Sequence, residues 1–177
     1  MKVSSVVQPR AAGPELEFES TRGFLLERVD AAKPMVQKAI DLLAEPVPGG
    51  ALKPYSPEAA HLDAIIGATL GSSNLVQETL LWYGQLRNNA ALPAPLETRE
   101  PAVLAHLMTA TQGLARTDGM VRAMIDVGQT PLDGKDMWRF QALAEAEDAL
   151  TFLQETRILI EGLTPRAAGA DAAPARV

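Results

Sequence analysis

Cysteine is absent from the 177-residue sequence. This absence excludes a disulfide framework, an iron–sulfur cluster, a thiolate zinc site and a cysteine nucleophile. Basic side chains are also in short supply, since 16 lysines and arginines stand against 22 acidic residues and leave a net charge of −6. A chain of this charge is repelled by nucleic acids and by anionic membrane surfaces, and we expect neither as a partner.

Long apolar runs are missing as well. No segment approaches the ~18 consecutive apolar residues of a membrane span. Ser4, Gln8 and Arg10 interrupt the N-terminus where a secretory signal needs an apolar stretch. We therefore expect a soluble, cytoplasmic protein. The apolar share of 47% is that of a globular chain, and the length suits one domain with a sizeable core.

Proline and glycine cluster in three places and divide the chain, at residues 45–57, 88–101 and 127–134. Between these breaks, apolar residues recur every three to four positions, and no alternating strand pattern extends beyond a few residues. The pattern predicts an all-α protein, an up-down-up-down four-helix bundle with antiparallel neighbours and a long second helix. The expected divisions are an irregular N-terminal segment at 1–19, the bundle at 20–164 and a disordered tail at 165–177.

Capping signals indicate where the second and fourth helices begin and end. Ser56-Pro57-Glu58 combines a favoured N-cap, a proline suited to the first turn and an acid that complements the helix dipole. The second helix should begin here and continue to about Arg87. Thr130-Pro131-Leu132-Asp133 is similar to a capping box for the fourth helix, which should end at Gly162.

Two positions interrupt the helical pattern. Proline has no backbone N–H, so Pro34 should kink the first helix or start a new one near Asp30. Thr117-Asp118-Gly119 indicates a bend or a restart in the third helix. The positions that we expect to face the core are Leu25, Val29, Ala32, Val36, Ile40, Leu43, Leu62, Ile66, Thr69, Ser73, Val76, Leu80, Tyr83, Leu104, Leu107, Leu114, Val121, Ile125, Phe140, Leu143, Ala146, Leu150, Leu153 and Ile160.

Charge is distributed unevenly over the expected helices. Residues 20–45 contain eight charged side chains and residues 131–163 contain ten, whereas residues 57–89 and 102–128 contain only four each. A surface helix normally keeps a charged face in water, so a helix poor in charge is usually covered on most sides. We therefore expect another molecule to cover the second and third helices, and a two-fold homodimer is the commonest arrangement.

Candidates for this interface lie on the same two helices. Small residues recur at steps of three to four along the second helix and would let another helix approach closely, from a second copy or from the same chain. Of the adjacent Trp82 and Tyr83, one ring should face the core and the other solvent or an interface. Methionines on the third helix either fill the core, their commoner role, or adapt to a partner. The interface residues that we expect are Ala60, Ala64, Gly67, Gly71, Trp82, Met120 and Met124.

Few residues have the pattern of a catalytic or metal site. Glu58 and His61 share one helix face at the Glu-x-x-His spacing of di-iron bundles, but such a site needs a second motif, and His106 has no acid at the matching position. Neither histidine is followed by the lysine and glycine of histidine phosphotransfer bundles. The glycines of residues 67–71 lack the Gly-Lys-Ser/Thr ending of a phosphate loop. We expect no metal, no cofactor and no catalytic residue.

Two further groups have weaker chemical potential. Glu145 and Asp148 share a face of the most charged helix, which favours a solvated face over an acid–base pair. Ser72–Asn74 is a polar step in an apolar helix without a base for a nucleophilic serine. The favoured function is a non-enzymatic interaction protein: a homo-oligomeric scaffold, adaptor or chaperone-like binder of another protein. The alternative is a bundle that holds a small molecule or metal inside, with or without enzymatic activity, through Glu58, His61 and Ser72–Asn74.

Overall fold

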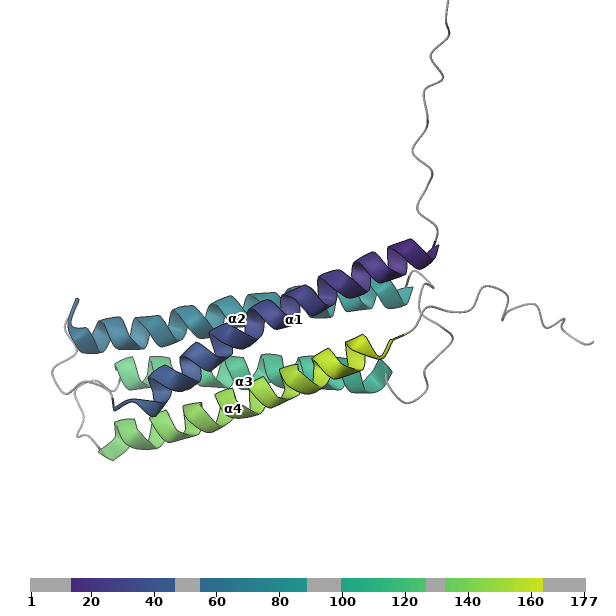
Figure 1. Ribbon diagram of the computed structural model, residues 1–177. Helices are drawn as coiled ribbons and strands as arrows, with labels where there is room; N and C mark the ends of the chain where they lie inside the picture. The colour runs from purple at the N-terminus through teal and green to yellow at the C-terminus, as the bar shows by residue number, and fades with distance from the viewer. Residues whose placement is uncertain (1–13, 47–54, 89–99, 127–132, 164–177) are drawn as a thin grey trace, which may run out of the picture.

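Four long helices form the body of the protein in the computed structural model (Figure 1). The structure describes residues 14–46, 55–88, 100–126 and 133–163, and none of these residues lies in a strand. The helices are α1 (Pro14–Ala44), α2 (Pro57–Asn88), α3 (Glu100–Asp126) and α4 (Asp133–Glu161). At a rise of about 1.5 Å per residue, the 32 residues of α2 extend over roughly 48 Å.

Each helix packs against two others around the bundle. Helix α1 contacts α2 and α4, and α3 contacts the same two helices, while the diagonal pairs make no contact within the described residues. Successive helices run in opposite directions, so α1 begins at the end of the bundle where α4 finishes (Figure 1). The prediction of an all-α four-helix bundle with antiparallel neighbours is confirmed.

Helix α1 begins at Pro14, six residues before the boundary expected at residue 20. Proline suits the first turn of a helix, and the buried Phe18 extends the apolar stripe of α1 by two turns toward the N-terminus. The segment 1–13 and the tail 165–177 lie outside the described residues, as does the expected cap at Thr130.

The predicted start of α2 is confirmed by its hydrogen bonds. The Oγ of Ser56 accepts a hydrogen bond from the Ala59 amide at 3.2 Å, and the Ser56 carbonyl accepts one from the Ala60 amide at 3.0 Å. The side-chain oxygen of Ser56 thus supplies an acceptor that the first turn of α2 would otherwise lack.

Helix α4 ends at Glu161, one residue before the glycine expected to stop it.

Neither expected interruption restarts a helix. Helix α1 is continuous through Pro34, which lies on the exposed side, so the Asp30 carbonyl that lacks its usual donor can bond water. Helix α3 likewise continues through residues 117–119. The Oγ1 of Thr117 donates to the carbonyls of Gly113 at 2.9 Å and of Ala142, on α4, at 3.3 Å. A residue expected to break α3 therefore ties it to its neighbour.

The core follows the predicted stripe on α1 and, at four of its seven predicted positions, on α2. All six positions predicted on α1, from Leu25 to Leu43, are buried. On α2 the predicted Leu62, Thr69, Val76 and Tyr83 are buried. At the other three predicted positions the buried side chains lie one residue earlier than expected. They are Ile65, Ser72 and Thr79, whereas Ile66, Ser73 and Leu80 are half-buried.

Hydroxyl groups are accommodated in this core because their own helix supplies acceptors. Ser72 donates to the Thr69 carbonyl at 2.9 Å, and Thr79 donates to the Leu75 carbonyl at 2.8 Å. Thr156 on α4 bonds in the same way to the carbonyl four residues earlier. Such bonds remove most of the cost of burying a hydroxyl, so small polar side chains can replace apolar ones where helices approach.

On α4 a buried arginine takes the place in the core that the sequence pattern assigns to the aromatic residue after it. Phe140 is 58% exposed and therefore not part of the core, whereas Arg139 is only 8% exposed. The Nη1 of Arg139 donates to the carbonyls of Leu43 at 2.9 Å, Ala44 at 3.2 Å and Glu45 at 3.4 Å. These carbonyls end α1, which has no basic residue in its own last turn, so Arg139 caps a helix other than its own.

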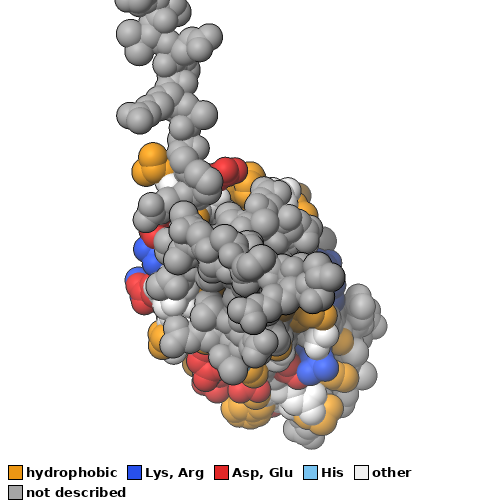
Figure 2. Space-filling view, turned by 90° about the vertical axis from the view of Figure 1, so that its right-hand side faces the viewer, with side chains coloured by type: hydrophobic (Ala, Val, Ile, Leu, Met, Phe, Trp, Pro, Cys, Tyr) orange, Lys and Arg blue, Asp and Glu red, His pale blue; other side chains and the backbone are white. Residues whose placement is uncertain are grey.

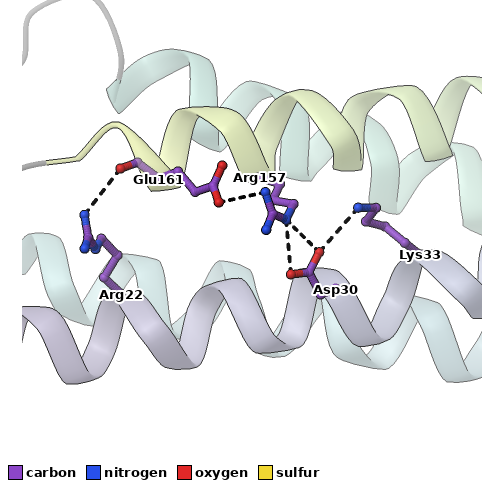
Figure 3. Close-up of polar contacts among 5 residues, drawn as sticks. All are labelled: Arg22, Asp30, Lys33, Arg157 and Glu161. Atoms are coloured by element: carbon purple, nitrogen blue, oxygen red, sulfur yellow. Dashed lines mark hydrogen bonds and ion pairs between the residues drawn. The ribbon is translucent and has the colours of Figure 1, made fainter.

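The opposite end of the α1–α4 pair has the reciprocal arrangement. Arg22 of α1 donates to the Glu161 carbonyl at 3.3 Å (Figure 3), and it also donates to the Leu163 carbonyl at 3.0 Å, just after the end of α4. Between the two caps, Arg157 bonds Asp30 across the helices at 2.8 Å and Glu161 at 2.7 Å. The hydrogen bond and the charge of Asp30, followed by the charge of Glu161, raise the pKa of Arg157. The α1–α4 side of the bundle is thus a charged surface on which ion pairs and hydrogen bonds join the two helices.

Candidate protein interface

The outward side of α2 is almost free of charge. Its exposed positions recur at alternating steps of three and four residues, which is the spacing of one helix face. No charged residue occurs between Asp63 and Glu78. The exposed uncharged residues along this face are Ala60, Gly67, Leu70, Asn74, Gln77 and Leu81.

Helix α3, which packs beside α2, has a similar outward side. From residue 102 to residue 115 the helix contains no lysine, arginine, aspartate or glutamate. Its exposed residues in this stretch are Ala105, Met108, Thr109, Gln112 and Ala115. We call these residues, together with the exposed uncharged residues of α2, the α2–α3 surface.

Apolar exposure alone does not distinguish this surface. Large apolar side chains are exposed on every helix, among them Leu16 on α1 and Ile158 on α4, each at 66%. Looking along the bundle axis, Figure 2 shows apolar side chains at several places on its margin, next to charged ones. Depletion of charge is what sets the α2–α3 surface apart, and it is the compositional property of the centre of a protein interface.

An aromatic pair borders the α2–α3 surface on the side of α1. The rings of Phe24 and Trp82 lie 5.2 Å apart, and the Arg28 guanidinium lies over the Phe24 ring at 4.6 Å. Arg28 also pairs with Glu78 at 3.3 Å. Trp82 is 41% exposed and Tyr83 is fully buried, so the prediction that one of these two rings faces the core is confirmed. The pairing offsets the charge of Glu78, one of the few acids near the surface.

The strip of small residues on α2 has two different environments. Ala60 and Gly67 are exposed, and a Cβ built on Gly67 has no atom within 4 Å. Ala64 and Gly71 are half-buried, and a Cβ on Gly71 would lie 3.0 Å from the Sδ of Met35 on α1. At Gly71 the helix that approaches therefore belongs to the same chain, whereas Gly67 is open to a neighbour.

The methionines of α3 divide between core and surface. Met124 is fully buried, so its side chain is not available on the surface of the monomer. Met120 is half-buried and packs against the core. Met108, which was not among the expected interface residues, is 52% exposed. Methionine content alone does not tell an exposed methionine from a buried one. The feature of the sequence that could have identified Met108 is its position within the uncharged stretch of α3.

The structure does not bring the candidate chemical residues together. Glu58 is buried at 3% exposure and His61 is half-buried. Ser72 lies 14 residues further along the same helix than Glu58, a separation of about 21 Å at the helical rise. Among the described residues, no three histidine, aspartate or glutamate side chains form a group that could hold a metal ion.

The remaining ionisable candidates link helices α3 and α4. His106 Nε2 lies 3.5 Å from a carboxylate oxygen of Glu155, and its ring centroid lies 5.4 Å from that of Phe152. Glu145 pairs with Arg116 across the same two helices at 3.2 Å. His106 and Glu145 each contact the neighbouring helix, so both side chains have a structural role in the packing of α3 against α4.

No protein-family model matches the chain, and no curated protein or solved structure matches it. Within the described part of the chain, every helix is too short or too polar to cross a membrane.

Proposed function

We propose that this protein is a non-enzymatic interaction module that binds another protein chain through the α2–α3 surface. The observation that carries the proposal is the scarcity of exposed charge on the outward side of two adjacent helices: among the described residues, the exposed charged side chains are Asp63 and Glu78 on α2 and Arg116 and Arg122 on α3. The α1–α4 side of the same bundle presents several interhelical and intrahelical ion pairs to solvent.

The composition of the α2–α3 surface suits a protein partner. Leu70, Leu81 and Met108, which are 44%, 63% and 52% exposed, supply apolar area that gains free energy when water is removed. Gln77 and Gln112 are exposed amides that can both donate and accept hydrogen bonds, which gives such a contact direction. A partner that covers residues 64–77 of α2 and residues 102–115 of α3 buries no charged side chain of this chain, since neither stretch contains one, and it avoids a cost of several kcal/mol.

A charge-insertion experiment tests this proposal. The double variant Gln77→Glu/Gln112→Glu places two charges on the surface at exposed positions, so the fold should remain intact. Ile158→Glu is the matched control, because it places a charge at an exposed apolar position on α4. Affinity-tagged full-length protein expressed in its native host would be purified with its bound proteins, including a differently tagged copy of itself.

We expect the wild type and Ile158→Glu to retain the same bound chain and the double variant to lose it. Direct binding of the purified components should reproduce this difference. Retention of every bound chain by the double variant, with helicity and melting temperature equal to those of the wild type, would refute the proposed surface.

A further inference from the structure

Polar contacts join the helices of the bundle at three of the four places where neighbouring helices meet. Between α1 and α4, the guanidinium groups of Arg22 and Arg139 each bond carbonyls at the end of the other helix. Midway between these two caps, Arg157 pairs with Asp30 at 2.8 Å (Figure 3). Helices α1 and α4 therefore cannot separate without breaking hydrogen bonds to charged groups.

The helices within each hairpin are joined as well. In the α3–α4 hairpin, Thr117 donates to the Ala142 carbonyl at 3.3 Å. A Cβ on Gly113 of the same hairpin would lie 3.0 Å from a backbone oxygen of α4, so the two helices approach closely there. In the α1–α2 hairpin, Arg28 pairs with Glu78 at 3.3 Å.

The contact between α2 and α3 lacks such links along most of its length. We call the packing of residues 59–82 of α2 against residues 102–121 of α3 the α2–α3 seam. Within these two described stretches, no hydrogen bond, ion pair or ring contact runs from one helix to the other. Apolar packing, which is not directional, is what holds the seam closed.

A row of half-buried side chains, spaced seven residues apart, borders the seam on each helix. The row on α2 lies across the buried stripe from Gly71, which contacts α1, and the row on α3 lies across it from Gly113, which contacts α4. Among the described residues, α2 packs only against α1 and α3, and α3 only against α2 and α4, so the two rows border the same seam. The rows are Ile66, Ser73 and Leu80 on α2 and Leu104, Thr111 and Asp118 on α3.

The hydroxyl groups of these rows bond within their own helix. Ser73 accepts a hydrogen bond from Gln77 at 3.4 Å, one turn further along α2. Thr111 donates to the Leu107 carbonyl at 2.8 Å. Separation of α2 from α3 would therefore break neither bond.

Asp118 makes the closed seam less stable. Its Oδ2 accepts a hydrogen bond from Arg122 of the same helix at 2.7 Å, whereas its Oδ1 is buried and has no hydrogen-bond partner. A buried carboxylate oxygen without a donor has lost the water that hydrates it in solution, and this loss costs free energy. Water would return to Oδ1 when α2 moves away, so the closed seam has a penalty that the open seam lacks.

We infer that the bundle opens along the α2–α3 seam, with the α1–α2 and α3–α4 hairpins moving as two units about the joined helices α1 and α4. Opening of this kind needs no bound partner. The side of the bundle on which exposed charge is scarce is then also the side that opens. A chain bound to the α2–α3 surface would reach the buried side chains of both helices through the open seam.

The absence of cysteine from the chain permits a direct test with single thiols. Thr69 is buried on α2 between Ile66 and Ser73 of the seam, and Thr156 is buried on α4, one turn after Phe152, whose ring contacts α3. Both hydroxyls bond carbonyls of their own helix. Thr69→Cys and its control Thr156→Cys are therefore matched in burial and in the hydrogen bond that each loses.

We expect Thr69→Cys to react with N-ethylmaleimide at least about 10-fold faster than Thr156→Cys in native buffer, after correction for the unfolding free energy of each variant. The reaction of Thr69→Cys should also accelerate less steeply with urea. The urea dependence scales with the surface exposed, and opening of one seam exposes less surface than global unfolding. Mass spectrometry of the intact protein would measure both rates.

A further variant tests the penalty at Asp118. Asp118→Leu removes the unpaired oxygen and continues the apolar character of Leu104 along the same row. It should slow the reaction of Thr69→Cys about 5-fold or more, while the reaction of Thr156→Cys should change only with the unfolding free energy of the bundle. An unchanged or faster reaction of Thr69→Cys in folded Asp118→Leu would contradict the penalty.

Equal corrected rates for Thr69→Cys and Thr156→Cys, with the same dependence on urea, would overturn the inference, because both thiols would then react only after global unfolding. This comparison does not depend on whether Asp118→Leu folds. No partner takes part in it, so its outcome is independent of the charge-insertion experiment with Gln77→Glu/Gln112→Glu. A seam that stays closed would leave the proposed function intact, and a bundle that opens without binding any chain would refute only that function.

Discussion

Replacing Arg139 with methionine should destabilise the bundle, because this side chain caps the end of α1. Methionine approximates the length of the arginine stem and removes only the guanidinium. The carbonyls of Leu43 and Ala44, at 2.9 and 3.2 Å from Nη1, would lose a charged donor, and the first of these two hydrogen bonds is buried while the second is partly buried.

The size of the effect follows from two opposing contributions. Hydrogen bonds to a charged group stabilise by about 1.5–3 kcal/mol each, and leaving a buried acceptor unsatisfied costs a similar amount. Against this, methionine avoids the cost of desolvating a charge at a position that is only 8% exposed. We expect a net loss of about 2–3 kcal/mol in the free energy of unfolding, or a decrease in Tm of roughly 4–12 °C for a chain of this length.

Urea denaturation followed by circular dichroism would measure the global loss, and hydrogen exchange would locate it. Exchange should accelerate most in the last turn of α1, because the carbonyls that lose their donor lie there. Arg157→Met is the control: it breaks the exposed contact with Asp30, and solvent screening should make its effect clearly smaller. Equal losses in the two variants, or a loss below about 0.5 kcal/mol in Arg139→Met, would refute the capping role.

Two other matched pairs test the packing between α3 and α4. Gly113→Ala should destabilise by about 1 kcal/mol or more because its Cβ would lie 3.0 Å from the backbone carbonyl of Glu145, whereas Gly119→Ala on the same helix meets no atom and should stabilise by roughly 0.5–1 kcal/mol. Thermal unfolding would show opposite signs, and a stabilising Gly113→Ala would contradict the close approach of the helices. Thr117→Val should cost about 0.5–1.5 kcal/mol by removing the bond to Ala142, while Thr109→Val, which loses only an exposed bond within its own helix, should be nearly neutral. Equal unfolding free energies for the two threonine variants would exclude a role for the interhelical bond.

The apolar periodicity predicted the four helices and the buried positions of α1. It failed at Arg139, a polar residue whose hydrogen-bond partners lie far away in the sequence. An apolar stripe favoured Phe140 over Arg139, but the acceptors for Arg139 are the carbonyls at the end of α1, 96 residues earlier in the chain. A contact over that distance leaves no mark on the local pattern of α4. On α2 the pattern missed Ser72 and Thr79 for a different reason, because these hydroxyls enter the core by bonding carbonyls of their own helix.

The candidate interface was predictable in part. The shortage of charge on α2 and α3 can be counted in the sequence, and the structure shows which of those residues face outward. Met124 and Met108 lie on the same helix, yet one is fully buried and the other is 52% exposed. Their difference depends on the orientation of α3 relative to α2 and α4, which requires the assembled bundle. Gly71, for the same reason, could not be assigned to Met35 before the position of α1 was known.

The reciprocal capping of α1 and α4 has a consequence for synthesis of the chain. The last carbonyls of α1 leave the ribosome 94 to 96 residues before the arginine that caps them. At ordinary elongation rates of 5–20 residues per second, that interval is about 5–20 s. During this time the nascent chain contains α1, α2 and α3 without the helix whose arginine caps the end of α1, and Arg22 lacks the carbonyls of α4 that it will cap. The last helix to be made is therefore the one that closes the bundle, and a chain interrupted before α4 lacks both caps at once.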